Sequence, residues 1–257
     1  MMEHSAHILL HDDNVHALEN LDRLFEVIYS DMVFEDLDLT WLILATHHLT
    51  KDGVIMVQTD HHSAYAVDAL LQKTLFYVND CVYKQEWGGV SQRYFPRKHD
   101  TIFIYANSHN YKFYPEHVLV PKKTLSQGLN PSGRAEKIPC DVFDDLGNFG
   151  TMSSERIKDP HTGRNFPWQK PLKLMDRLLL PFTDEGDWVL DTHLGTGTTG
   201  EWCVMNKRNF YGIEKDEHIF DIAKERISHA VPNNFYDTNP SSRISADENP
   251  EDAKLLE

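Results

Sequence analysis

The fold of this chain is decided by the stretch Trp188-Val189-Leu190-Asp191-Thr192-His193-Leu194-Gly195-Thr196-Gly197-Thr198-Thr199-Gly200. It combines a short apolar strand, an acidic residue, a glycine-rich turn and the start of a helix. Gly195 and Gly197 let the backbone turn sharply and approach a ligand closely, which a Cβ atom would obstruct. The free N–H groups at the start of the helix favour an anionic ligand group.

A second apolar run follows this turn and also ends in an acid. Asn209-Phe210-Tyr211-Gly212-Ile213 leads into Glu214. The acid stands about 20 residues after the turn, where a Rossmann-type unit holds the hydroxyl pair of a ribose. Strand, turn, helix, strand and acid in this order predict a site for a nucleoside-containing cofactor.

Strands alternate with helices along most of the chain, which predicts an α/β fold with a doubly wound, mostly parallel, Rossmann-like sheet. Prolines interrupt the periodicity between about 107 and 165, which predicts a small, irregular insertion. The expected strands are 7–10, 25–31, 54–60, 76–87, 101–106, 188–191 and 209–213. The expected helices are 14–24, 38–50, 62–75, one after Pro171, one after Gly197 and one ending near Ser228.

Bulk properties narrow the class of protein. The 257 residues suit one α/β domain with an insertion. No apolar run reaches about 18 residues, and no basic-then-apolar signal segment is visible. Cys81, Cys140 and Cys203 are scattered, so neither a disulfide framework nor a thiolate zinc site is indicated. These features predict a soluble, cytoplasmic protein without membrane association.

The net charge of −15 hides a basic central block. Residues 84–173 carry 14 Lys and Arg against 9 Asp and Glu, interleaved with aromatic residues. Such a block can contact a phosphate backbone and stacked bases, although an ordinary insertion with a mixed surface explains the composition equally well. The candidates for DNA contacts are Arg93, Arg97, Lys98, Lys122, Lys123 and Arg134.

Several further segments resemble motifs of a known family. Asp191–Thr199 resembles D-P-F-x-G-S-G-T-T, and Gly212–Glu214 resembles G-I-D/E. Trp168–Pro171 resembles T-Q-K-P, and Ser153–Arg156 resembles the segment just before it. Tyr83–Lys112 resembles a segment ending in R-x-x-H-E…Y. In this order the motifs resemble the β-class amino-methyltransferases of DNA, in which the catalytic half precedes the cofactor half.

The resemblance implies a division of the chain and a cofactor. Residues 1–106 would form the catalytic half, 107–165 the target-recognition region and 166–231 the cofactor half, followed by an acidic, disordered tail at 232–257. The implied cofactor is S-adenosylmethionine, and the implied substrate is the exocyclic N6 amine of adenine in DNA. The implied cofactor-binding residues are Asp13, Lys170, Asp191, Gly195, Gly197, Thr198, Thr199 and Glu214.

The resemblance also implies the catalytic residues, at a position where the chain departs from the family. Asp31-Met32-Val33-Phe34 replaces D-P-P-Y or D-P-P-F, so both prolines are missing. Asp31 and the Met32 carbonyl would accept the two N–H groups of the amine, and Phe34 would stack on the extruded base. The missing prolines keep open a catalytically impaired DNA-binding or partner subunit. A homodimer or a complex with a partner subunit is the expected assembly. Cytosine N4 and RNA are alternative targets.

Two histidine pairs raise the question of a metal. His47-His48 and His61-His62 are adjacent in the sequence, and the second pair follows Asp60. Neighbouring positions on a helix point in different directions. No third ligand is spaced to join either pair, so the sequence predicts no metal site.

Overall fold

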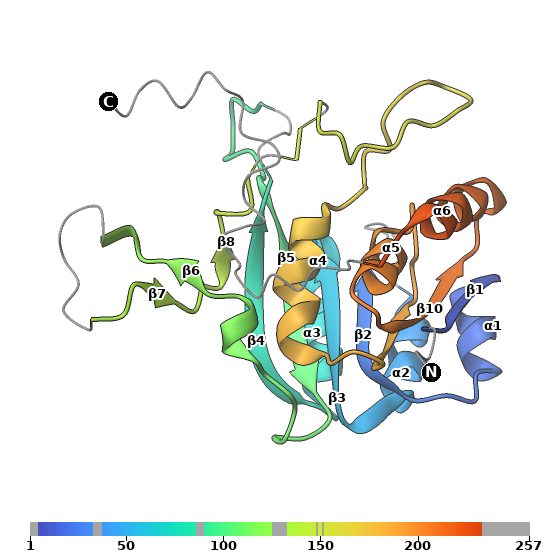
Figure 1. The fold of residues 1–257 in the computed structure, drawn as a ribbon, viewed down its shortest axis with the longest axis horizontal. Helices are drawn as coiled ribbons and strands as arrows, with labels where there is room; N and C mark the ends of the chain where they lie inside the picture. The colour runs from blue at the N-terminus through green and yellow to red at the C-terminus, as the bar shows by residue number, and fades with distance from the viewer. Residues whose placement is uncertain are drawn as a thin grey trace.

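The computed structural model describes residues 5–32, 38–85, 90–124, 133–147, 149–150 and 152–232. Their centre is an eight-stranded sheet (Figure 1). The strands from one edge to the other are β1 (His7–His11), β10 (Asn209–Glu214), β9 (Trp188–Asp191), β2 (Phe25–Asp31), β3 (Leu49–Thr59), β5 (His99–Ala106), β4 (Phe76–Lys84) and β8 (Val142–Phe143). The first five are parallel, and β5 runs antiparallel to both of its neighbours.

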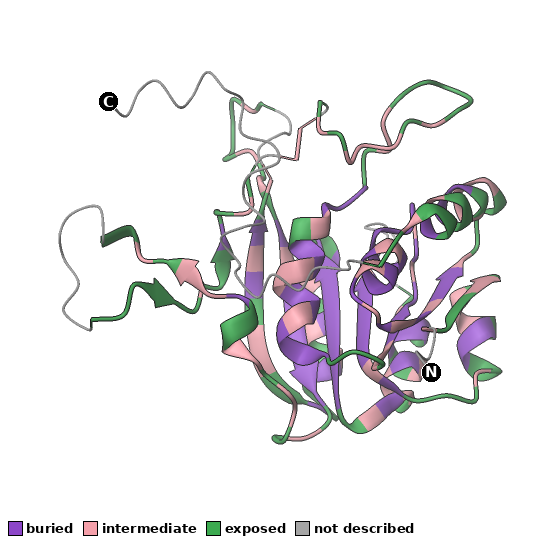
Figure 2. Cartoon of the chain, viewed as in Figure 1, coloured by how far each residue is buried: buried purple, intermediate pink, exposed green. Residues whose placement is uncertain are grey.

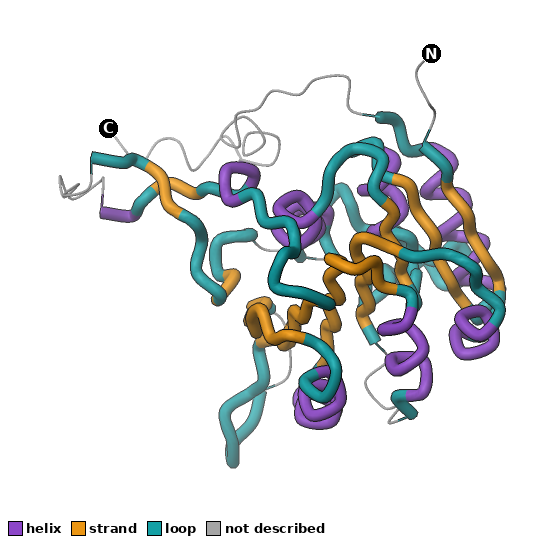
Figure 3. The backbone as a smooth tube through the Cα atoms, turned by 90° about the horizontal axis from the view of Figure 1, so that it is seen from below, coloured by secondary structure: helices purple, strands orange, loops and turns teal. Residues whose placement is uncertain are grey.

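Helices cover both faces of the sheet (Figures 1 and 3). One face carries α1 (Asn14–Glu19), α2 (Thr40–His47) and α3 (His61–Leu71). The other carries α4 (Leu172–Leu179), α5 (Thr198–Met205) and α6 (Glu217–His229). This arrangement confirms the predicted α/β fold with a mostly parallel sheet. None of the helices in the described ranges is long and apolar enough to cross a membrane.

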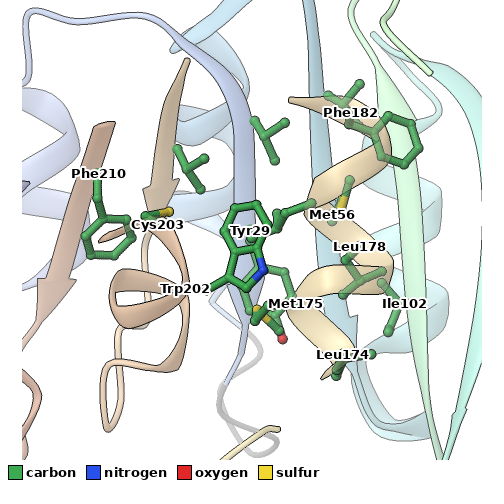
Figure 4. Packing of buried hydrophobic residues seen from close by; sticks show 14 of the residues in the cluster. Tyr29, Met56, Ile102, Leu174, Met175, Leu178, Phe182, Trp202, Cys203 and Phe210 are labelled. Atoms are coloured by element: carbon green, nitrogen blue, oxygen red, sulfur yellow. The ribbon is translucent and has the colours of Figure 1, made fainter. Parts of the chain in front are cut away.

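Alternation along the strands produces two hydrophobic cores, because successive side chains of a strand point to opposite faces. Tyr29 and Met56 face α4 and α5, whereas Ile28 and Ile55 face the helices on the other side. The central strands β9, β2, β3 and β5 and the inner sides of the helices are accordingly mostly buried (Figure 2). In the first core, Trp202 of α5 lies where α4 and α5 meet over the sheet (Figure 4).

Two element boundaries differ most from the sequence expectation, whereas α2 and α3 end three and four residues earlier than expected, at His47 and Leu71. Helix α1 ends at Glu19 rather than near residue 24, because the Asn20 side chain donates to the His16 carbonyl and closes the last turn. Strand β3 begins five residues earlier than expected, so Asp52-Gly53 lies within it rather than in a turn. Gly53 fits because a Cβ there would lie 2.9 Å from the Phe25 carbonyl oxygen.

The predicted insertion, residues 107–165, contains little regular structure. It holds the 3-10 helix η1 (Pro115–His117) and the short pair β6 (Val120–Pro121) and β7 (Glu136–Lys137). Figure 1 shows this pair projecting beyond the β4 side of the sheet. Strand β8 belongs to the same segment but joins the main sheet beside β4. The insertion therefore contributes an edge strand to the domain.

Close packing of α5 against α6 and β10 depends on Gly200. A Cβ at this position would overlap Cδ1 of Ile227 and lie 2.8 Å from Cε1 of Phe210. We expect Gly200→Ala to lower the free energy of unfolding by about 1–3 kcal/mol, although alanine favours a helix by about 1 kcal/mol. Urea denaturation measures this change. Ile227→Val removes the overlapping methyl group, so the double variant should lose less stability than the two single losses combined.

Candidate active site

Acidic residues from three parallel strands meet at the edge of the sheet that is formed by the carboxyl ends of these strands. Asp31, Asp191 and Glu214 are the last residues of β2, β9 and β10. The register places Tyr29 beside Asp191, and Gly212 beside Asp191 on the other side. Because ligands of open α/β sheets bind outside the carboxyl ends of the strands, these acids mark the candidate site.

The glycine turn has the backbone that its sequence predicts. Gly195 and Gly197 have φ values of +53° and +82°, which glycine adopts without strain. A Cβ at Gly197 would lie 3.1 Å from Ala223 of α6, whereas a Cβ at Gly195 would meet only the His193 carbonyl at 3.8 Å. The backbone at Gly195 therefore faces open space. Its N–H donates to Glu214 Oε2 over 2.9 Å, which joins the turn to the end of β10.

Asp191 is held by hydrogen bonds inside the protein. It is 2% exposed, and Oδ1 accepts from the His193 N–H over 3.0 Å. Burial raises the pKa of its carboxyl to about 7, because removal from water disfavours the charged form. Hydrogen bonds from Thr199 and His193 act in the opposite direction. The carboxyl thus titrates close to neutral pH.

Asp31 uses only one carboxylate oxygen within the described part of the chain. Oδ2 lies 2.5 Å from Nζ of Lys170, and both side chains are largely buried. Oδ1 is buried and has no hydrogen-bond partner among the described residues. Burial raises the pKa of this carboxyl, and the Lys170 ammonium opposes that effect. An unsatisfied buried carboxylate oxygen is costly, so it points to an acceptor kept for a ligand.

The neighbouring catalytic candidates are only partly described. Met32 is buried, and its N–H donates to the Gln58 carbonyl over 3.2 Å. Phe34 lies outside the described residues. Asp13 is the N-cap of α1, where its side chain accepts from the N–H groups of Val15 and His16.

The remaining cofactor candidates contact one another or residues of α4 at the place where the glycine turn lies beside that helix. Thr198 is buried and donates through Oγ1 to the Lys170 carbonyl over 3.1 Å. Thr199 is also buried and lies 3.6 Å from Sδ of Met175. The Lys170 side chain extends to Asp31. One lysine thus contacts the glycine-turn helix through its backbone and the end of β2 through its ammonium.

A family model described as DNA methylase, of the N6/N4 type, matches residues 32–225. The chain belongs to the N6/N4 DNA methylase family. This confirms the family expected from the motifs. The model spans most of the chain, from just after β2 to α6, so it includes the glycine turn and begins directly beside Asp31.

Individual relatives agree with this family. The Type II methyltransferase M2.LlaDCHI of Lactococcus lactis subsp. cremoris is 29% identical over 197 residues, which cover 75% of this chain and 66% of the relative. M2.DpnII of Streptococcus pneumoniae is 28% identical over 191 residues, covering 73% and 65%. The chain thus spans just under two thirds of each relative. The crystal structure of the M1.HpyAVI–SAM complex has a TM-score of 0.63 at 18% identity, over 86% of this chain and 99% of that one.

Within this DNA methylase fold, the six basic candidates form two groups. Arg93, Arg97 and Lys98 precede β5, at the same edge as Asp31, and Arg97 donates to Asp60 Oδ2 over 3.1 Å. Lys122, Lys123 and Arg134 lie beside the β6–β7 pair. Lys123 approaches Asp144 at 3.7 Å.

Sequence reasoning missed a buried polar network beside Asp31. Gln58 Nε2 and Gln85 Nε2 both donate to Asp100 Oδ2, over 2.8 and 2.6 Å. The Tyr29 hydroxyl donates to Gln58 Oε1 over 2.8 Å. Gln58 and Asp100 lie on the α4 face because each stands two residues along its strand from a core residue of that face, Met56 and Ile102 respectively. A glutamine closing the apolar run of β3 was the available signal.

Two groups of potential metal ligands come together in the described residues. Asp60, His61 and His62 form the first, where the Arg97 guanidinium contacts Asp60 and His61. Asp159, His161 and His218 form the second, with the two imidazole rings stacked 4.3 Å apart. A guanidinium already neutralises the first group, and parallel rings do not converge on one ion. The absence of a metal site stays a prediction.

The raised pKa of Asp191 makes stability depend on pH. Its folded-state pKa of about 7 lies above the ordinary 3.8, so the folded protein retains a proton that the unfolded chain releases between these values. Ionisation therefore destabilises the fold as pH rises through that window. As the pH rises from 4 to 8, we expect the free energy of unfolding of Asp191→Asn to increase by about 2–4 kcal/mol relative to that of the parent. Urea denaturation across this range measures the difference, and a difference independent of pH contradicts the assignment.

Proposed function

We propose that this protein transfers a methyl group from S-adenosylmethionine to an exocyclic amine in DNA, with N6 of adenine as the target. The observation that carries the proposal is the buried Oδ1 of Asp31, which has no partner among the described residues and lies at the carboxyl end of β2, beside the strand that leads into the glycine turn. Membership of the DNA methylase family supports the reaction class. The aspartate at the head of the catalytic segment favours adenine, because relatives acting on cytosine N4 usually carry serine there.

The glycine turn fits the cofactor. Gly195 leaves open space beside the backbone. Glu214, the expected ribose ligand, accepts a hydrogen bond from the Gly195 N–H and therefore lies next to this space. The cofactor would supply an electrophilic methyl group on a sulfonium. M1.HpyAVI, which has a similar fold, was crystallised in complex with SAM, and this supports the same ligand here. The residues proposed to hold the cofactor are Asp13, Lys170, Asp191, Gly195, Gly197, Thr198, Thr199 and Glu214.

Asp31 would assist the amine directly. The lone pair of an exocyclic amine is delocalised into the ring, which makes the nitrogen a poor nucleophile. A carboxylate that accepts one N–H favours tetrahedral geometry and stabilises the positive charge that develops on nitrogen. The Met32 carbonyl is the proposed second acceptor. The Met32 backbone is held in place by the hydrogen bond from its N–H to the Gln58 carbonyl of β3. Phe34 is the proposed stacking partner of the base.

The target atom is not reachable inside a duplex, so the base would be extruded from the stack. The loop before β5 lies at the Asp31 edge and exposes two aromatic side chains, with Tyr94 74% and Phe95 99% exposed. Arg93 in the same loop supplies positive charge for a phosphate backbone. These features support DNA as the partner of this edge.

The direct test incubates the protein with DNA and isotopically labelled S-adenosylmethionine, followed by mass spectrometry of the nucleosides. We expect labelled N6-methyl-2′-deoxyadenosine for the parent. Asp31→Asn should reduce its formation by about 100-fold or more, because the substitution removes the charged acceptor. Asp22→Asn changes an exposed acid and serves as the matched control. Equal label in the parent and Asp31→Asn would contradict the proposal, and label on cytosine would redirect it to N4.

Cofactor binding tests the turn separately. Gly197→Ala places a Cβ against Ala223 and strains a backbone with φ of +82°. Gly186 has a similar φ of +85°, but a Cβ there would meet nothing within 4 Å. Both variants should lose about 1–2 kcal/mol of stability from strain. Calorimetry should show binding of S-adenosylmethionine weakened at least about tenfold by Gly197→Ala alone, which corresponds to about 1.4 kcal/mol of binding free energy. Equal affinities for the two variants would contradict the turn assignment.

A further inference from the structure

Lys170 places a buried ammonium group against the proposed catalytic carboxylate. Its Nζ lies 2.5 Å from Asp31 Oδ2 and 3.9 Å from Asp100 Oδ2, and it approaches the Trp168 carbonyl at 3.4 Å. The Lys170 side chain is 8% exposed, and that of Asp100 is 6% exposed. The family resemblance implied a position for Lys170 beside the cofactor. The ion pair with Asp31 gives this side chain a second role.

The backbone around Lys170 is fixed from two directions. Its carbonyl accepts from Thr198 Oγ1, and Pro171 after it is the N-cap residue of α4. Gln169 before it is 5% exposed and donates from Nε2 to the Glu155 carbonyl over 2.5 Å. Glu155 Oε2 in turn accepts from the Leu172 N–H at the start of α4. The ammonium is therefore presented to Asp31 by a rigid segment.

Asp100 is fixed as firmly on the far side of the ammonium. Its Oδ2 accepts from Gln58 and Gln85, and Gln58 is itself held by the Tyr29 hydroxyl. Lys170 thus sits between two carboxylates. The Asp100 carboxylate is hydrogen-bonded to neighbouring side chains, whereas Oδ1 of Asp31 has no partner among the described residues.

We propose that Lys170 is a positioning residue of the methyl transfer, holding Asp31 Oδ2 so that the charged carboxylate presents Oδ1 to the amine. Asp100 is the counter-charge that holds the ammonium in place. This inference rests on the proposed function. It assigns Lys170 an effect on the reaction even where cofactor affinity is unchanged, because the ammonium contacts the carboxylate.

Electrostatics agree with the geometry. Burial raises the pKa of Asp31, Lys170 lowers it, and Asp100 raises it by like-charge repulsion. The other titratable groups that act electrostatically with Asp31 are Asp191 of β9, Tyr29 of β2 and Tyr83 of β4. Removing Lys170 and removing the charge of Asp100 should therefore move the pKa of Asp31 in opposite directions. A merely structural role would produce no such pair of shifts.

The test compares Lys170→Met, Lys170→Arg and Asp100→Asn with the parent. NMR titration of the Asp31 carboxyl carbon in the ligand-free protein measures its pKa without any need for turnover. The pH profile of methyl transfer at saturating cofactor measures the acid limb. We expect Lys170→Met to raise the pKa of Asp31 and the pKa of the acid limb by about 1–3 units. We expect Asp100→Asn to lower the same two pKa values by up to about one unit. Lys170→Arg keeps the charge and should restore most of the parent behaviour.

Each outcome decides between the alternatives. Opposite shifts for Lys170→Met and Asp100→Asn support the proposal, and unchanged titration of Asp31 in folded Lys170→Met overturns it. Should Lys170→Met fail to fold, a lowered pKa of Asp31 in Asp100→Asn together with a nearly unchanged pKa in Lys170→Arg supports the proposal, and an unchanged pKa in Asp100→Asn overturns it. A parent without methyl transfer refutes the proposed function, whereas the NMR titration still reports whether Lys170 controls Asp31.

Discussion

Strand β2 lies between β9 and β3, and both neighbours run parallel to it. Its pairing with β9 brings the start of the chain beside the glycine turn, with Tyr29 opposite Asp191. Parallel strands end at a common edge, so this single register places the Asp31 carboxylate next to the candidate cofactor site. Helices α4 and α5 cover the same face and pack together around Trp202. Moving β2 by one residue would turn Asp31 to the opposite face.

Burial of acidic groups sets the chemistry of that edge. Asp31 and Asp191 both have raised pKa values because burial removes them from water. The two carboxylates differ in the groups that offset the cost of their burial. Asp191 receives hydrogen bonds from its own turn, whereas Asp31 has an ammonium on one oxygen and no described donor on the other. The first arrangement stabilises a loop, and the second leaves an acceptor that a ligand can use.

The sequence predicted the sheet and the glycine turn, because strand periodicity and glycine placement are local signals, and the family resemblance implied the order of the motifs. It predicted Asp31 and Glu214 as strand-end acids for the same reason. The contact of Lys170 with Asp31 was out of reach, since it depends on how α4 packs across the sheet. Asp100 was visible as part of a motif, but its place beside Lys170 follows from the antiparallel course of β5. The start of β3 was misjudged because Asp52-Gly53 is typical of a turn, whereas the register with β2 continues the strand through it.

The hydrogen bond from Thr198 to the Lys170 carbonyl has a thermodynamic consequence. It connects the first residue of α5 to the same lysine whose ammonium rests on Asp31. A ligand that reorders the turn acts on that ammonium, and a proton added to Asp31 weakens the hold on the lysine. Linkage is reciprocal, so occupancy of the turn and protonation of a carboxylate on another strand must influence each other equally. Ligand binding should then take up or release a fraction of a proton, even for a molecule that never contacts Asp31.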